Sequence, residues 1–413
     1  MSSFFKSIGK TWQNLGFLPR IVVGIVIGAV LAIVCPGVTW IGMLGKVFVE
    51  ALKAIAPLLV FVLVMSSLAQ HEEGTETNVG EIVGLYILGM LMACLVAVTM
   101  NYAFLPTLVF TGGGQSVSAP GSVDEVLRNL FINMVTNPVK AIADGNYIGI
   151  LFWAIVIGLA LRKASAISKQ VSREIADCIS LVINWVVSCT PYGVIGLIFN
   201  ALVEKGFSIF FVYGQLLCII VGCMLIVALV ANPILAFWKM KRNPFPLVFL
   251  CLKESGITAF FTRSSAANIP INMSICERLG LDKSTYSISI PLGATINMEG
   301  SAIKIAILSL AAANTLGITV EVPSALLLCV IATISACGTS GVPSGALLLL
   351  PLSCGLFGIT TDIAMQVVAT GFIIDVVQDA FGTALNSSAD VLFTAAVDLG
   401  NRRTPKKKTT SGD

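Results

Sequence analysis

Long apolar stretches separated by short polar segments fill the first part of this chain. They lie at residues 18–35, 41–69, 79–110, 146–162, 174–203 and 207–238. A helix needs about 20 mainly apolar residues to cross the hydrocarbon core of a bilayer. The pattern therefore predicts six membrane-spanning helices up to residue 238, several of them long enough to be tilted.

Two later regions carry apolar arms that are interrupted by polar residues. Between Pro323 and Phe357, two arms of about a dozen residues flank the sequence ACGTSGVPSG, and each arm is shorter than a span. Between Phe245 and Ile275, the polar residues Arg263, Ser264 and Ser265 interrupt an apolar stretch. Non-helical backbone at membrane depth is tolerated only inside protein or beside a water-filled cavity. We predict two re-entrant hairpins, which in transporters meet at the binding site; two kinked helices are the alternative.

A third interruption lies between these hairpins, at residues 286–316, in the sequence PLGATINMEGSAIK. Asn297, Glu299 and Lys304 break the apolar pattern there, and glycines stand on either side. An unwound turn at this position would free backbone carbonyl oxygens, which are ligands that a small hard cation prefers. A simple helical kink without an ion explains the same pattern equally well.

The last apolar stretch, residues 362–399, carries a row of polar residues. These are Asp375, Asp379, Thr383, Asn386 and Asp390. At about 100° per residue, the five side chains project within an arc of about 80° on one helix face. A carboxylate at bilayer depth costs at least about 2.5 kcal/mol, so three of them need a cation, an ammonium group or another helix beside them. The row indicates a transport pathway.

Composition agrees with a membrane protein and excludes several classes of site. Hydrophobic residues make up 56% of the 413 residues, and charged residues only 11%, against about 25% in a soluble domain. His71 is the only histidine, which excludes a histidine-based metal site or catalytic triad. The eleven cysteines form no CxxC pair and are expected to be buried apolar residues. A phosphate-binding GxxxxGK[ST] loop is absent from the sequence, so ATP is not the expected energy source.

Basic residues set the expected orientation. They cluster at Lys6 and Lys10, at residues 162–173, at residues 239–242 and at residues 402–408, and poorly basic loops lie between these clusters. Because loops rich in Lys and Arg stay in the cytoplasm, we expect both termini to be cytoplasmic. The last cluster is expected to be a tail beside membrane lipid, and no nucleic-acid partner is expected.

Four motifs occur in one order: RSSAANIP, PLGATINMEGS, the hairpin tip GTSGVPSG, and the spacing D-x3-D-x3-T-x2-N-x3-D. Together they resemble the dicarboxylate/amino acid:cation symporter family, which includes glutamate transporters and neutral amino acid exchangers, and the resemblance extends over nearly the whole chain. It implies an all-α polytopic membrane protein with eight transmembrane helices plus two re-entrant helical hairpins. It also implies a homotrimer in the bacterial inner membrane that works by an elevator-type movement.

The resemblance implies a division of the chain into three parts. Residues 1–242 would hold membrane helices 1–6 and form mainly the scaffold and trimerisation region, with helices 3 and 6 belonging to the transport domain. Residues 243–398 would form the core of the transport domain, with hairpin 1, helix 7, hairpin 2 and helix 8. Residues 399–413 would be the basic cytoplasmic tail.

The same resemblance implies sites for sodium as the coupling ion, with no organic cofactor. One ion would be held by Gly293, Asn297, Asn386 and Asp390, with a carboxylate oxygen from Asp390 and carbonyl oxygens from the others. A second would be held by Thr295 and the carbonyl oxygens of Ala336, Cys337 and Thr339. The family's third site maps approximately onto Tyr86 and Glu299. Because Glu299 stands where the family has aspartate, fewer sodium ions are expected.

The resemblance also implies how a small amino acid substrate would be held. Main chain around Ser264, Ser265, Val342 and Gly345, with the Asn386 amide, would bind its α-carboxylate and backbone, and Asp379 would pair with its ammonium group.

Gly382 stands where carriers of acidic amino acids have an arginine. An acidic side chain would lack a partner there, so a small neutral substrate is favoured. Ser301 and Thr383 are placed to meet its hydroxyl group. We expect Arg263 to neutralise Asp375.

The sequence thus predicts import of L-serine and L-threonine coupled to sodium entry. A sodium- or proton-coupled carrier for another amino acid or a dicarboxylate such as aspartate or glutamate stays open as an alternative, as does an ion channel, because polar rows also line pores. We do not expect an enzyme. An intramembrane aspartyl protease needs two facing aspartates, whereas Asp375 and Asp379 lie on one helix and the sequence has no GxGD motif.

Overall fold

The computed structural model describes residues 17–69, 78–110, 128, 132–339 and 344–402, and all regular secondary structure in these residues is helical. The helices of the first part are α2 (Phe17–Val34), α3 (Trp40–Ala69), α4 (Val79–Phe104), α6 (Pro138–Asp144), α7 (Tyr147–Leu161), α8 (Ala166–Ser188), α9 (Thr190–Lys205), α10 (Ser208–Ile226), the π-helix η1 (Val227–Ala231) and α11 (Asn232–Met240). The second part contains α12 (Phe245–Cys251), the π-helix η2 (Leu252–Gly256), α13 (Ile257–Thr262), α14 (Ser265–Arg278), α15 (Lys283–Ile296), α16 (Glu299–Thr315), α17 (Val322–Cys337), the 3₁₀ helix η3 (Gly345–Leu349), α18 (Leu350–Gly355) and α19 (Thr361–Asn401).

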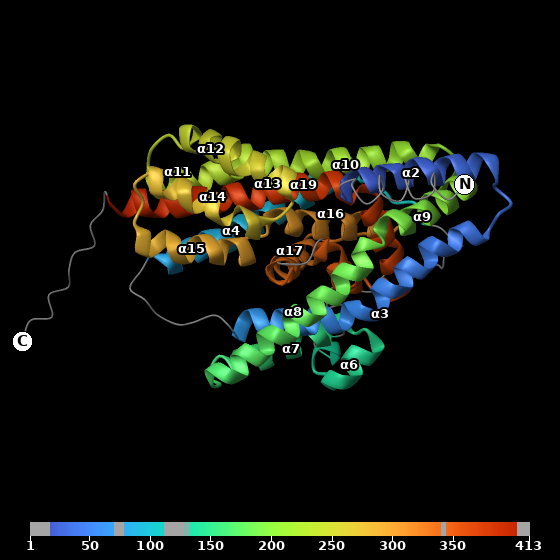
Figure 1. Cartoon of the computed structure of the whole chain (residues 1–413), viewed down its shortest axis with the longest axis horizontal. Coiled ribbons are helices and arrows are strands. Elements are labelled where there is room, and N and C mark those ends of the chain that lie inside the picture. Colours follow the sequence, from blue (N-terminus) through green and yellow to red (C-terminus); the bar gives the residue numbers. More distant parts are fainter. Residues whose placement is uncertain (1–16, 70–77, 111–127, 129–131, 340–343, 403–413) are drawn as a thin grey trace, which may run out of the picture.

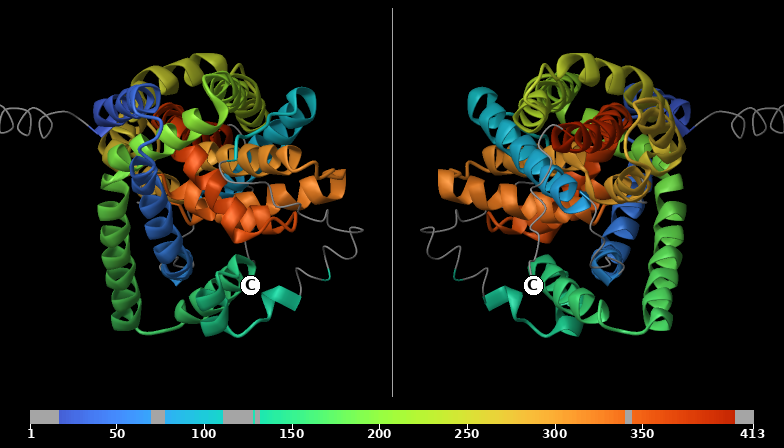
Figure 2. Two further views of the ribbon diagram at one scale, coloured as in Figure 1. Left: turned by 90° about the vertical axis from the view of Figure 1, so that its right-hand side faces the viewer. Right: turned by 90° about the vertical axis from the view of Figure 1, so that its left-hand side faces the viewer.

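Helix α19 is the longest element and lies inside the bundle, along the long axis of the molecule (Figure 1). Its 41 residues contain no proline and run without a break. It contacts α10, α11, α13, α14, α15, α16 and α18, and the end-on views show these helices around it (Figure 2). The sequence prediction of one helix over residues 362–399 is therefore confirmed, and the polar row along it is enclosed by protein.

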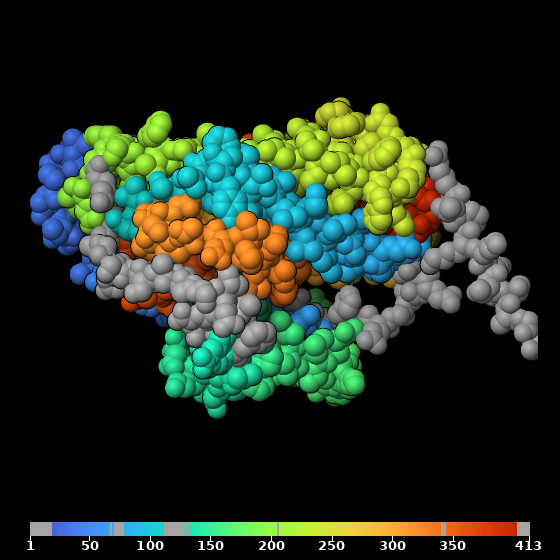
Figure 3. All heavy atoms as spheres, turned by 180° about the vertical axis from the view of Figure 1, so that it is seen from behind, coloured from blue at the N-terminus to red at the C-terminus, as the bar shows by residue number. Residues whose placement is uncertain are grey.

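A second group of helices lies against one side of this bundle. α3 and α8 slant away from it, with α7 and α6 beside them (Figure 1), and the space-filling view shows this group projecting from the main body (Figure 3). Glycines bring α3 close to α9: a Cβ atom on Gly196 of α9 would lie 2.3 Å from the Gly45 nitrogen of α3. Close backbone approach at glycines is typical of helix packing in membranes.

Six helices in the described ranges are long and apolar enough to cross a membrane, or seven if α8 and α9 together form one bent span. Residues 245–262 pass this test on length, although the sequence assigns them to a hairpin arm. Four apolar segments are shorter, namely residues 19–34, 147–161, 322–337 and 345–355. The last two are the short arms predicted for the second hairpin.

The predicted single span at residues 174–203 is wrong in one respect, because the chain bends by 48° between α8 and α9. Pro191 has no N–H group and cannot bond to the Val187 carbonyl one turn earlier. The Thr190 hydroxyl donates to that carbonyl instead, at 2.5 Å. The apolar run is continuous across the bend, so hydrophobic length alone does not reveal it.

The first interrupted region forms a helical hairpin in which α13 and α14 contact each other. Arg263 sits at its tip with a φ of 52°, a left-handed conformation that is uncommon for a residue with a side chain. Ser264 then caps α14, because its hydroxyl oxygen accepts from the Ala267 N–H at 3.2 Å. The edge-to-face contact between Phe260 and Phe381, with ring centres 5.1 Å apart, holds this tip against α19.

The other predicted interruptions are also present. α15 ends at Ile296 and α16 begins at Glu299, with Asn297 and Met298 in non-helical conformations between them. α17 ends at Cys337 and η3 begins at Gly345; residues 340–343 of this tip lie outside the described ranges. Of the two alternatives left open for residues 286–316, an unwound turn and a simple kink, the structure shows the unwound turn.

Candidate functional site

Two carboxylates of α19 and two cations from other elements form a buried charge cluster. The Arg263 guanidinium donates to Asp379 Oδ2 from Nε at 3.0 Å and from Nη2 at 2.8 Å, and it reaches Asp375 Oδ2 at 3.4 Å. The Lys304 ammonium lies 2.9 Å from Asp379 Oδ1 and 4.0 Å from Asp375 Oδ1. The formal charges of these four side chains balance, which lets the carboxylates lie in a non-aqueous interior.

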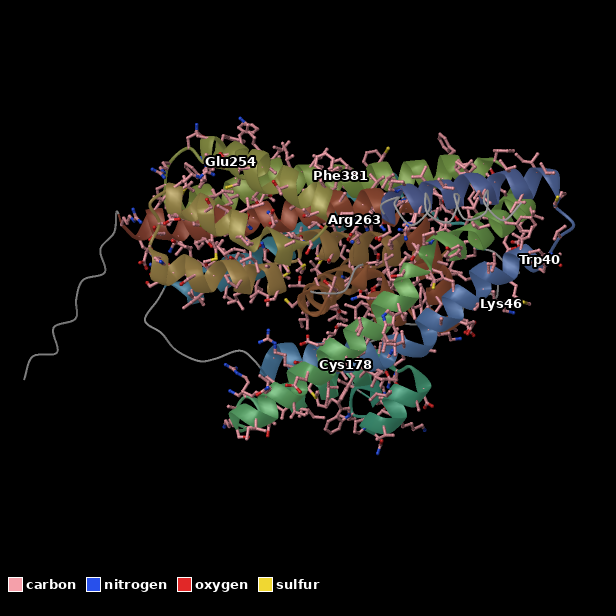
Figure 4. All side chains as sticks on the ribbon, in the orientation of Figure 1. Trp40, Lys46, Cys178, Glu254, Arg263 and Phe381 are labelled. Carbon is pink, nitrogen blue, oxygen red and sulfur yellow. The ribbon has the colours of Figure 1, made fainter. Side chains whose placement is uncertain are left out.

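The cluster lies near the middle of the bundle, where the label of Arg263 marks the tip of the α13–α14 hairpin (Figure 4). Lys304 and Asp375 are 3% exposed, whereas Asp379 is 14% and Arg263 is 13% exposed. The Ser344 hydroxyl, at the start of η3, also donates to Asp375. Both interrupted regions therefore reach the same pair of acids, and Asp379 is the more accessible of the two.

The predicted partner of Arg263 was Asp375, and the structure places the two groups in contact. The closer contact of Arg263 is nevertheless with Asp379, which was predicted to pair with a substrate ammonium. Lys304 was identified in the sequence only as a break in an apolar helix, and its contact with both acids was missed. The available signal was a lysine in the middle of an apolar helix at membrane depth.

A second polar cluster surrounds the break between α15 and α16. The Asn297 amide donates to Asp390 Oδ1 at 2.9 Å and to the Asn386 carbonyl at 3.2 Å, and the Gly300 N–H donates to Asn386 Oδ1 at 2.8 Å. A Cβ atom on Gly293 would lie 2.6 Å from Asp390 Oδ1. Gly293, Asn297, Asn386 and Asp390, predicted to share one sodium site, are therefore brought together.

Two side-chain oxygen atoms of this cluster have no hydrogen-bond donor among the described residues. Asp390 Oδ2 and Asn297 Oδ1 are buried, and within the described ranges no donor reaches either of them. A buried carboxylate oxygen without a donor is costly, whereas carboxylate and amide oxygens are good ligands for a hard cation. These residues fit the predicted sodium ion.

Glu299 and Tyr86 lie next to this cluster. Glu299 Oε2 accepts from the Asn232 amide at 2.8 Å, and its Oε1 has no donor among the described residues. The Tyr86 hydroxyl donates to the Ser289 carbonyl at 3.1 Å and lies 3.5 Å from the Asp390 carbonyl. Asn232 was missed from the sequence, because it is brought to Glu299 from a distant helix, at the end of the π-helix η1.

The remaining predicted sodium ligands lie on α15 and on the second hairpin. Thr295 is exposed, and its hydroxyl donates to the Leu292 carbonyl of its own helix at 2.7 Å. The Thr339 hydroxyl donates to the Ala336 carbonyl at 2.8 Å, and Cys337 beside them is half-buried. The structure thus places Ala336 and Thr339 in contact and leaves Thr295 bonded within its own helix.

The residues predicted to bind the substrate lie on α14, α16, α19 and the second hairpin. The Thr339 hydroxyl lies 3.3 Å from the Ser301 hydroxyl, and the Thr383 hydroxyl donates to the Asp379 carbonyl at 2.8 Å. Ser265 begins α14 and Gly345 begins η3. Val342 lies outside the described residues.

Gly382 has a packing role in addition to the role predicted for it. A Cβ atom on Gly300 of α16 would lie 2.4 Å from the Cα atom of Gly382, so the two helix backbones touch at these glycines. A Cβ atom on Gly382 itself would lie 3.3 Å from the terminal methyl group of Met224. A longer side chain at Gly382 would therefore meet α10 and α16.

The sodium:dicarboxylate symporter family model matches residues 17–399. The chain belongs to this family. Proteins named serine/threonine transporter SstT from three strains of Streptococcus agalactiae, of serotypes III, Ia and V, are each 54% identical over 390 residues, which is 94% of this chain and 97% of theirs. The predicted family, and the prediction of a transporter and not an enzyme, are confirmed, and the family name implies sodium as the coupling ion.

Proposed function

We propose that this protein imports L-serine and L-threonine together with sodium ions. Its relatives at 54% identity are named serine/threonine transporters, and the glycine at position 382 leaves an acidic substrate side chain without the arginine that carriers of acidic amino acids place there. One observation carries the proposal: α19 bears both a partly accessible acid, Asp379, and a buried acid, Asp390, whose second carboxylate oxygen has no hydrogen-bond donor among the described residues.

The substrate would bind between the two interrupted regions. Asp379 would accept its ammonium group, and main chain around Ser264, Ser265 and Gly345 would bind its carboxylate with the Asn386 amide. Charge-assisted hydrogen bonds of this kind are short and strong. Ser301, beside Thr339, and Thr383, whose hydroxyl bonds to the Asp379 carbonyl, would meet the substrate hydroxyl.

Sodium would bind at Asn297 and Asp390 with carbonyl oxygens of Gly293 and Asn386. Thr295 and the carbonyl oxygens of Ala336, Cys337 and Thr339 would form a second site, and Tyr86 with Glu299 a third. Each monovalent cation that enters down about 100 mV contributes about 2.3 kcal/mol before any concentration difference is added. One or two sodium ions are enough to concentrate a neutral amino acid.

The movement would be of the elevator type, in a homotrimer of the plasma membrane with both termini in the cytoplasm. Residues 243–398, with membrane helices 3 and 6, would move as the transport domain, and the rest of residues 1–242 would form the scaffold and trimer contacts. A carrier is favoured over a channel because Arg263 and Lys304 form ion pairs with Asp379, so protein cations occupy the polar row of α19.

Uptake into proteoliposomes tests the proposal. Labelled serine should accumulate when sodium is present outside, and replacing sodium with choline should abolish accumulation. Unlabelled threonine should compete, and unlabelled aspartate should not. Preferential uptake of aspartate, or uptake driven by a proton gradient without sodium, would overturn it, and flux that does not saturate would favour a channel.

A further inference from the structure

The Lys304 ammonium binds one of the two carboxylate oxygens of Asp379, the acid proposed to pair with the substrate ammonium. It lies 2.9 Å from Asp379 Oδ1, while the two Arg263 nitrogens take Asp379 Oδ2 at 3.0 and 2.8 Å. Both oxygens of Asp379 are thus engaged by cations. An amino acid whose ammonium pairs with Asp379 must displace one of them.

Lys304 is the cation that can give way. Arg263 makes three contacts with the two acids in a planar, two-pronged arrangement, whereas Lys304 makes one close contact and has a second acid, Asp375 Oδ1, only 4.0 Å away. A lysine ammonium is a compact charge on a flexible stem, while an arginine is held in a fixed geometry. A small rotation of the lysine stem therefore transfers its charge from Asp379 to Asp375.

We propose that Lys304 is a tethered cation that replaces the substrate ammonium in the empty carrier. It pairs with Asp379 when no substrate is present and moves to Asp375 when substrate binds. This inference rests on the function proposed above. Lys304 is a positioning residue in this scheme, because it acts through Asp379 and does not touch the substrate.

Lys304 should matter most in the step in which the carrier returns across the membrane without substrate. With Lys304 in place, two cations balance two acids that are mostly or fully enclosed. Without it, the empty cluster would carry an uncompensated negative charge at bilayer depth, which is costly. Exchange of internal for external serine does not include an empty return, so Lys304 should matter for net uptake much more than for exchange.

The test compares two fluxes in proteoliposomes that contain equal amounts of monodisperse wild-type or variant carrier. Net uptake is sodium-driven entry of labelled serine into vesicles without serine, and exchange is its entry into serine-loaded vesicles. Lys304→Met should lower the ratio of net uptake to exchange at least about tenfold. Lys239→Met, which removes a lysine paired with Glu81 at 2.6 Å outside the site, should leave the ratio unchanged.

A double variant separates charge balance from loss of structure. Lys304→Met with Asp375→Asn leaves Arg263 to balance Asp379, so the ratio should return close to the wild-type value. This variant also keeps the proposal testable if Lys304→Met alone does not fold, because net uptake must then persist in the double variant.

An unchanged ratio in Lys304→Met, an equal loss of both fluxes in folded protein, or a double variant that exchanges without net uptake would each overturn the tethered-cation proposal. Absence of sodium-dependent serine uptake by the wild-type protein would instead overturn the proposed function. The two failures are therefore distinguishable.

Discussion

At the scale of single residues, the candidate site separates into a charge-balanced part and a part with oxygens to spare. Arg263 and Lys304 balance Asp375 and Asp379, whereas Asp390 keeps a buried oxygen for which no described residue provides a donor. The first part suits a zwitterion whose ammonium group replaces the Lys304 ammonium at Asp379. The second part suits a cation without its hydration shell.

Thr383 provides a prediction about specificity at this scale. Its hydroxyl already donates to the Asp379 carbonyl, so its oxygen is free to accept from a substrate hydroxyl. Thr383→Val should lower the preference for serine over alanine by about tenfold, because a site built to bond a hydroxyl discriminates through that bond. The measurement is competition of unlabelled alanine with labelled serine uptake.

Thr370→Val on the same helix is the matched control, since Thr370 is buried and its hydroxyl is hydrogen-bonded to Tyr213 on α10. It should leave the preference unchanged. An unaltered preference in Thr383→Val would show that this hydroxyl does not meet the substrate.

The sequence predicted the polar row of α19 because helical periodicity fixes which residues share a face. It also placed Arg263 near these acids, since a hairpin tip is a short, local feature. It named Asp375 as the partner, whereas Asp379 is the closer one, because the two side chains are one helical turn apart and a long guanidinium reaches both. The contacts of Lys304 and of Asn232 with Glu299 depend on how distant helices pack, which local patterns do not contain.

At the scale of elements, a buried hydrogen-bond network joins the first hairpin to α19. The Ser387 hydroxyl accepts from the Asn268 amide at 2.8 Å and from the Asn272 amide at 3.0 Å, and it lies 3.2 Å from the Ser255 hydroxyl. Ser255 belongs to the π-helix η2, and π-helical turns are frequent at functional positions. The network fixes the hairpin that carries Arg263.

Ser387→Ala should lower the stability of the folded protein by about 1 to 3 kcal/mol, because it leaves buried amide donors with fewer acceptors. Ser388→Ala is the matched control, since among the described residues the Ser388 hydroxyl donates only to carbonyls of its own helix. The check is the temperature at which each purified variant loses its monodisperse state. Equal temperatures for the two variants would contradict the role assigned to the network.

The crossing of α16 and α19 at Gly300 and Gly382 makes a second prediction at this scale. Gly300→Ala would place a Cβ atom 2.4 Å from the Gly382 backbone, which cannot move aside as a flexible side chain can. Overpacking of this kind costs about 1 to 3 kcal/mol and should also impair serine uptake, because the helices that carry Lys304 and Asp379 are pushed apart.

Gly84→Ala on α4 is the control, since a Cβ atom there meets nothing within 4 Å. It should retain both heat stability and uptake. Full uptake by Gly300→Ala would show that this close crossing is not required.

At the scale of the whole molecule, an ion pair links the two groups of helices. Lys53 of α3 pairs with Asp362 at the start of α19, and we propose that α3 belongs to the scaffold and α19 to the transport domain. If these domains slide past each other during transport, the pair must separate in each cycle.

A Lys53→Cys, Asp362→Cys variant tests that movement in a background without the eleven native cysteines. A short bifunctional thiol reagent should block serine uptake, and a reductant that cleaves the link should restore it. Either single-cysteine variant treated with the reagent should keep its uptake. Transport at the full rate by the cross-linked protein would rule out an elevator movement at this boundary.

The hydrophobic pattern predicted the helical class of the whole molecule but not every helix end. Runs of apolar residues set the approximate spans, yet the bend at Pro191 lies inside a continuous run, because proline breaks a hydrogen bond without making the sequence polar. Likewise, α7 has 15 residues, since Asn146 caps its start through the Gly149 N–H. Local backbone chemistry, more than hydrophobicity, decides these boundaries.

The central claim is that α19 couples a sodium ion to a zwitterion, and the sodium dependence of uptake by Asp390→Asn tests it most directly. This change removes a charge from the proposed sodium site while keeping a side chain of the same shape beside Asn297. The sodium concentration for half-maximal serine uptake should rise at least about tenfold, equivalent to about 1.4 kcal/mol of cation binding. Asp398→Asn, a buried acid on the same helix that pairs with Arg402, should leave that concentration unchanged. An unshifted sodium dependence in folded Asp390→Asn protein would contradict the account.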